Sequence, residues 1–124
     1  MAIAQARLGD LPLALQTAAD ALERADASNL PYMRTEARRC LGELLVADGR
    51  AQEGLRRFEE VLELTAGTDA RVSRLWTGPP HVETLLALGR RQEAAEVFQA
   101  YAAMVAECQS PWFRSEVERL RARL

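Results

Sequence analysis

The chain has 124 residues, the length of one domain of ordinary size, and its 48% hydrophobic and 27% charged residues allow it to form a core. A formal net charge of −2 provides no overall attraction to nucleic acid or to anionic membranes. All 16 basic residues are arginine, alanine and leucine dominate the apolar residues, and β-branched residues are scarce, so the composition predicts an all-α protein and excludes a β-sandwich, a collagen-like chain, a disulfide scaffold and a membrane span.

Apolar residues recur at helical intervals along the chain, and no segment shows the alternation typical of a strand. Asp10, Asp69 and Ser110 each precede a helical segment, and Pro111 follows Ser110. These short polar side chains are candidate N-caps, because their oxygen atoms accept hydrogen bonds from free backbone N–H groups. The predicted helices cover residues 2–8, 11–26, 31–48, 51–65, 71–88, 91–108 and 111–123.

One predicted helix contains the sequence Gly-Pro-Pro at residues 78–80. Two prolines remove two backbone donors from a helix interior. We therefore expect a kink or a break there, with one piece at about 70–77 and the other at about 80–88. The bend is either a connection without a ligand role or a device that exposes Trp76 and His81 in a groove.

Glycines recur every 40 residues, at Gly9, Gly49 and Gly89, each after the end of a predicted helix. Glycine closes the last turn of a helix at little cost because it tolerates a positive φ. A small residue follows five positions later each time, which permits close approach of the paired helices. We therefore expect a right-handed solenoid of αα-hairpins with about six to seven antiparallel helices. The predicted single domain, 1–124, divides into units at about 1–28, 29–68 and 69–109 and a capping helix at 110–124.

The segment from Leu41 to Phe58 resembles a tetratricopeptide repeat. It has Leu-Gly in its first helix, Gly49 at the turn, Gly54 as the small residue five positions later and the aromatic Phe58 beyond it. Val61 departs from the alanine that the family usually has, and the period of 40 exceeds the usual ~34 residues. The resemblance implies a module that binds a peptide or a partner protein through a helical-repeat surface.

The segment from Pro80 to Leu124 is similar to the helical repeats of large ATP-dependent LuxR-type and maltose-activator-like bacterial transcriptional regulators. The similar residues are His81 to Ala94, followed by Ser-Pro-Trp at 110–112. This second resemblance implies an alternative role as an effector-sensing or oligomerisation fragment of such a regulator. Gene context would distinguish the two, since the fragment would have an NTPase upstream and a helix-turn-helix downstream.

The residue types that catalysis and metal binding need are few. His81 is the single histidine, and no nucleophile motif frames Ser73 or Ser110. The chain has no lysine, which excludes a phosphate-binding loop of the kind that needs a lysine and also excludes catalysis through a lysine Schiff base. Cys40 and Cys108 lie far apart within apolar patterns, which predicts two buried, reduced thiols. We therefore expect no enzymatic activity, no metal and no cofactor.

The expected partner is a protein or a peptide. Acidic residues interleave with the arginines, so we expect no direct binding of nucleic acid, and the lack of a signal peptide or a long apolar segment predicts a cytoplasmic protein without membrane contact. Trp and Arg are favoured contact residues, although Trp76 could equally pack within its own hairpin. Alignment of the repeats places six residues toward the groove: Glu36, Arg39, Glu43, Trp76, Pro79 and Glu83.

The N-terminal end is the second candidate for association. The helix predicted at 2–8 has only about two turns, so it leaves part of the alanine-rich face of the next helix open. An open apolar end of a solenoid favours pairing. We expect this end to be covered by a second copy of the chain, giving a homodimer, or by upstream residues.

Overall fold

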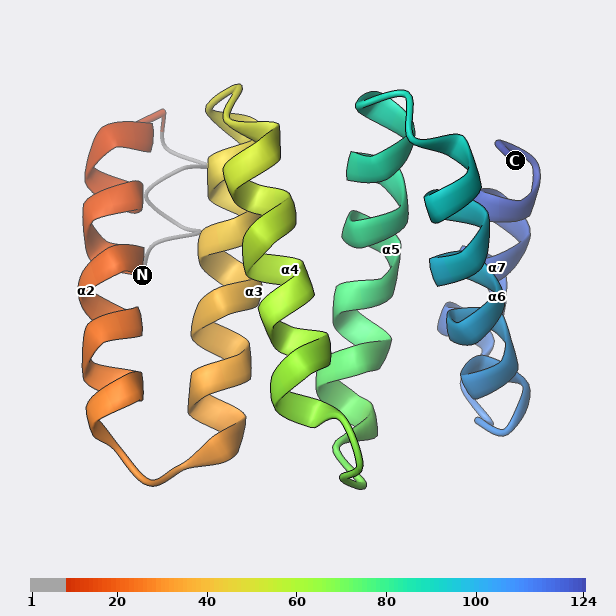
Figure 1. Cartoon of the computed structure of the whole chain (residues 1–124), viewed down its shortest axis with the longest axis horizontal. Helices are drawn as coiled ribbons and strands as arrows, with labels where there is room; N and C mark the ends of the chain where they lie inside the picture. Colours follow the sequence, from red (N-terminus) through yellow and green to blue (C-terminus); the bar gives the residue numbers. More distant parts are fainter. Residues whose placement is uncertain (1–8) are drawn as a thin grey trace. The chain divides into compact units, whose positions relative to one another are not determined.

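The computed structural model describes residues 9–124. Within that range the protein is all-α, without a strand, as the composition and periodicity predict (Figure 1). Its helix bounds lie within two residues of the predicted ones, whereas the helix expected at 2–8 lies outside the described residues. The helices are α2 (Leu11–Ala27), α3 (Pro31–Ala47), α4 (Ala51–Thr65), α5 (Arg71–Ala87), α6 (Arg91–Ala106) and α7 (Pro111–Arg121).

The helices form two compact units, the first ending at Thr68 and the second beginning at Asp69. In the first unit α3 packs against both α2 and α4. In the second unit α6 packs against α5 and α7, and α7 also contacts α5. The boundary falls where the 40-residue spacing starts a new repeat. These helical hairpins are consistent with a solenoid; its handedness and its organisation as a single domain stay predictions.

The turns after α3 and α5 have the same backbone geometry. Gly49 and Gly89 have φ values of 82° and 76°, and Gly9 has a φ of 85°. After Gly49, the N–H of Arg50 donates to the carbonyl of Leu45 at 2.8 Å. After Gly89, the N–H of Arg90 donates to the carbonyl of Leu85 at 2.9 Å. This is the Schellman closure of a helix C-terminus. The prediction that the spaced glycines end helices is therefore confirmed for Gly49 and Gly89, whereas the helix expected before Gly9 lies outside the described residues.

Two of the three predicted N-caps are confirmed. Asp10 and Ser110 each accept a hydrogen bond from the backbone N–H three residues later, at 3.1 and 3.4 Å. The prediction for Asp69 is wrong, because Ala70 occupies the N-cap of α5 and no side chain caps that helix. The carbonyl of Asp69 instead accepts a hydrogen bond from the N–H of Arg71 at 2.8 Å, so the helix starts one residue too late for the Asp69 side chain.

Helices α3 and α4 approach closely where two glycines face each other. A Cβ atom on Gly54 would lie 2.7 Å from the carbonyl oxygen of Gly42, and one on Gly42 would lie 2.7 Å from the ring of Phe58. Phe58 and Leu55 are fully buried beside this contact. Since any side chain would collide there, the two glycines set the distance between the helices.

Helix α5 continues through Pro79 and Pro80, so the full break, one of the two outcomes expected there, does not occur. The prolines remove two main-chain hydrogen bonds. Two threonine hydroxyls add bonds on either side of them: Thr77 donates to the carbonyl of Ser73 at 2.6 Å, and Thr84 donates to that of Pro80 at 2.7 Å.

Helix α5 also packs closely against α6 beside the prolines. A Cβ on Gly78 would overlap the ring of Tyr101, so the α5 backbone lies directly on that ring. Tyr101 is itself buried, as are Thr77 and Val82 on either side of the prolines. Contact with the neighbouring helix therefore outweighs the local preference of the Gly-Pro-Pro sequence for a break.

The contact between Gly54 and Gly42 predicts that Gly54→Ala destabilises the protein. Helix propensity alone would favour alanine by about 1 kcal/mol, but overpacking against a backbone atom costs more. We expect the free energy of unfolding in urea to fall by about 1–3 kcal/mol. The control is the exposed Ala103 of α6, where Ala103→Gly should cost about 1 kcal/mol. A Gly54→Ala variant as stable as the wild type would contradict the close contact.

Candidate functional site

The three groove residues predicted on α3 form one ion-pair cluster. The guanidinium of Arg39 contacts the carboxylate of Glu36 and lies 2.5 Å from that of Glu43, because residues three and four apart share a helix face. Burial opposes the charge of Arg39, whose side chain is 14% exposed, but its hydrogen bond to Glu36 and the charge of Glu43 outweigh burial and raise its pKa. Recognition of an acidic ligand by Arg39 would require these pairs to open.

The cysteine beside this cluster is not activated as a nucleophile. Cys40 is half-buried, and burial raises the pKa of its thiol, although the charge of Arg39 opposes that effect. A raised pKa keeps the thiol protonated at neutral pH, and the thiolate is the nucleophilic form. Cys108 is also free and half-buried, so both thiols are unpaired as predicted but less deeply buried than expected.

On α5, Trp76 belongs to an aromatic cluster with two residues of α7. Its ring centroid lies 5.0 Å from that of Trp112 and 5.2 Å from that of Phe113, and the latter two are 4.9 Å apart. Phe113 is buried, whereas Trp76 and Trp112 remain 44% and 50% exposed. Trp76 therefore packs within its unit and also presents an aromatic face to solvent.

Sequence reasoning did not select Trp112. The available signal was its place directly after Ser110 and Pro111, in the first turn of a predicted helix. Trp76 and Trp112 are also the only two tryptophans of the chain. Of the other predicted residues on α5, Pro79 is buried, so its side chain does not belong to an exposed surface.

Glu83 extends the contact between α5 and α7 into a charged region. Its carboxylate contacts the guanidinium of Arg119 and lies 3.4 Å from that of Arg123, while Arg119 also pairs with Glu116 at 2.9 Å. Hydrogen bonds to both glutamates raise the pKa of Arg119. The network couples the two helices through partly exposed charges.

The aromatic and charged contacts lie along one seam. Glu83 follows Trp76 by seven residues, and Arg119 follows Trp112 by seven residues. Seven residues are about two turns of helix, so the two contacts occupy matching heights on helices that run in the same direction. We call the seam of Trp76, Glu83, Trp112, Glu116 and Arg119 the α5–α7 surface.

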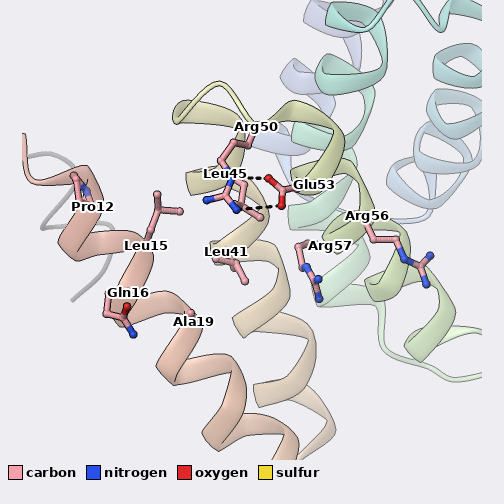
Figure 2. A pocket seen from close by; sticks show the side chains of 10 residues that line it. All are labelled: Pro12, Leu15, Gln16, Ala19, Leu41, Leu45, Arg50, Glu53, Arg56 and Arg57. Carbon is pink, nitrogen blue, oxygen red and sulfur yellow. Dashed lines mark hydrogen bonds and ion pairs between the residues drawn. The ribbon is translucent and has the colours of Figure 1, made fainter.

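A separate groove of about 410 Å³ lies in the first unit. Figure 2 shows apolar residues of α2 and α3, and charged residues of α4 and of the turn before it. The cations of the groove are already paired: Arg50, which precedes α4, with Glu53, and Arg56 and Arg57 with glutamates further along α4. The groove therefore offers no uncompensated positive charge to an anion. Its lining residues are Pro12, Leu15, Gln16, Ala19, Leu41, Leu45, Arg50, Glu53, Arg56 and Arg57.

The single histidine lies inside the second unit. His81 is 3% exposed, and burial together with the charge of Arg90 lowers its pKa to about 4, against a smaller opposing effect of Glu93. The imidazole is therefore neutral at pH 7. Its depth points to a structural role rather than to contact with a ligand.

No protein-family model, curated protein or solved structure matches this chain. Within residues 9–124, no group of three or more His, Cys, Asp or Glu residues is arranged to hold a metal ion. In the same range, no helix combines the length and the apolar content needed to cross a membrane.

The buried imidazole predicts a loss of stability between pH 7 and pH 5. In that window the unfolded chain, with a histidine pKa near 6.5, binds a proton that the folded chain, with a pKa of about 4, does not. Unfolding is therefore favoured as the pH falls, and we expect the free energy of unfolding to drop by about 2 kcal/mol. Urea titrations of the wild type and of His81→Gln at both pH values measure this, since the variant should lose most of the drop. An equal drop in the variant would show that His81 is not the group responsible.

Proposed function

We propose that the chain is a protein-interaction module, rather than an enzyme, and that it binds an extended segment of a partner on the α5–α7 surface. The observation that carries the proposal is the exposure of Trp76 and Trp112 side by side. Tryptophan is enriched among residues that dominate binding energy, because it offers a large contact area at a small entropic cost. Phe113 supports both rings from beneath, so the aromatic face is already ordered before a partner arrives.

The spacing of the surface suggests the kind of segment that fits. The aromatic pair and the pair of Glu83 with Arg119 are about two helical turns apart, or ~10 Å. An extended peptide rises ~3.3 Å per residue, so about three of its residues span that distance. We infer a partner segment with an apolar or proline side chain for the tryptophans and a charged side chain about three positions away.

The repeat architecture supports the same reading. The closing turns at Gly49 and Gly89 and the contact of Gly42 with Phe58 are the features that a tetratricopeptide-like repeat would use. Such repeats present rigid helix surfaces to partner proteins. We therefore propose a tetratricopeptide-like module. The repeat region of a bacterial transcriptional regulator is one kind of protein in which such a module would act.

The test is a selection of peptides from a random display library against the whole chain. Binding of the selected peptides is followed by tryptophan fluorescence, which reports on this surface directly because both tryptophans lie in it. We expect Trp76→Ala and Trp112→Ala each to weaken binding at least about tenfold, the effect of losing an anchoring side chain worth more than 1.4 kcal/mol.

The control is Tyr32→Ala, which removes an exposed aromatic side chain from α3 in the first unit. This variant should bind the selected peptides as the wild type does, as judged by anisotropy of labelled peptides. Selected peptides that bind both tryptophan variants with unchanged affinity would contradict the proposal, and so would a selection that yields no binder.

A further inference from the structure

A second groove, of about 580 Å³, lies between α2 and α3 in the first unit. Ala18 and Ala25 on α2 are buried by the packing of the chain itself, whereas Ala21 is exposed and Met33 at one end is 49% exposed. Alanine side chains allow the axis of another helix to come close, and methionine adapts to the shape of its neighbour. The apolar side chains that line the groove are Ala18, Ala21, Ala25, Met33, Ala37 and Cys40.

Two opposite charges stand on one edge of this groove. Asp20 and Arg24 both line it, both are exposed, and they are four residues apart, so they lie one above the other on α2. Asp20 accepts a hydrogen bond from the side-chain amide of Gln16 at 3.0 Å. Neither residue has an ion pair with any residue of the described chain.

We propose that a second copy of the chain occupies the groove, with the α2 helices of the two copies packed antiparallel across a two-fold axis. If the axis passes along the exposed side of α2 at a height midway between the two charges, a rotation of 180° places Asp20 of each copy opposite Arg24 of the other. Such a rotation keeps a given edge of one helix facing the same edge of its partner. The two charges share an edge, so both symmetric ion pairs form together.

A small side chain also lies near the proposed axis. Ala21 lies next to the proposed axis, where two helices approach most closely and only small side chains fit. The contact covers about two turns of each helix and buries less than the ~800 Å² per partner of a standard stable interface. We therefore expect a reversible dimer that forms in the micromolar range or above. This inference does not rest on the α5–α7 surface.

Sedimentation velocity of the whole chain over a range of concentrations tests the proposal. Asp20→Arg and Arg24→Asp each place like charges opposite each other in the homodimer, so each variant alone should associate at least about tenfold more weakly than the wild type. An equimolar mixture of the two variants restores both ion pairs, because each copy then supplies the charge that the other lacks. The mixture should dimerise as the wild type does.

Glu96→Arg and Arg91→Asp, which make the same changes of net charge on exposed positions of α6, are the matched controls. They should leave dimerisation unchanged, and circular dichroism should show that all variants remain helical. A chain that stays monomeric overturns the proposal. The occupant of the groove would then be another segment of the protein or a different protein. A dimer that is equally strong in each charge variant and in the mixture also overturns it.

Discussion

The contact that the rest of the structure depends on is the close approach of paired helices at glycine. Gly54 lies against the carbonyl of Gly42 in the first unit, and Gly78 lies against the ring of Tyr101 in the second. In both places a Cβ atom would collide with its neighbour, so the distance between the helices is fixed by the absence of a side chain. Large apolar residues beside these points, among them Phe58 and Val82, are fully buried.

This packing also explains why a Gly-Pro-Pro sequence lies within a continuous helix. A helix that loses two main-chain hydrogen bonds is unstable by itself, but here the residues around the prolines are buried against their neighbours. Because α5 is continuous, Trp76 and Glu83 lie two turns apart on one rigid helix. Both therefore contact α7, Trp76 through Trp112 and Glu83 through Arg119, and form the α5–α7 surface.

Local signals predicted most of the fold. Some features depend only on residues that are close in sequence, so the sequence alone predicts them. They are the spaced glycines, the caps at Asp10 and Ser110 and the helical periodicity. The full break, one of the two outcomes expected at 77–80, was wrong because proline acts locally, whereas the packing of Tyr101 on Gly78 joins residues far apart in sequence. The candidate site was predicted in part. Trp76 and Glu83 were selected, but Trp112 depends on how α7 lies against α5, which periodicity does not encode.

Rigidity is the property that joins the fold to the proposed function, because an ordered aromatic surface loses little entropy when it binds. Native-state hydrogen exchange of the whole chain tests most directly whether the glycine contacts hold the hairpins. The slowest amides should lie around Gly42 and Gly54 and on both sides of the prolines in α5, from Thr77 to Thr84. Fast exchange over that stretch of α5, with protection elsewhere, would show that the helix opens at the prolines and would contradict the packing described here.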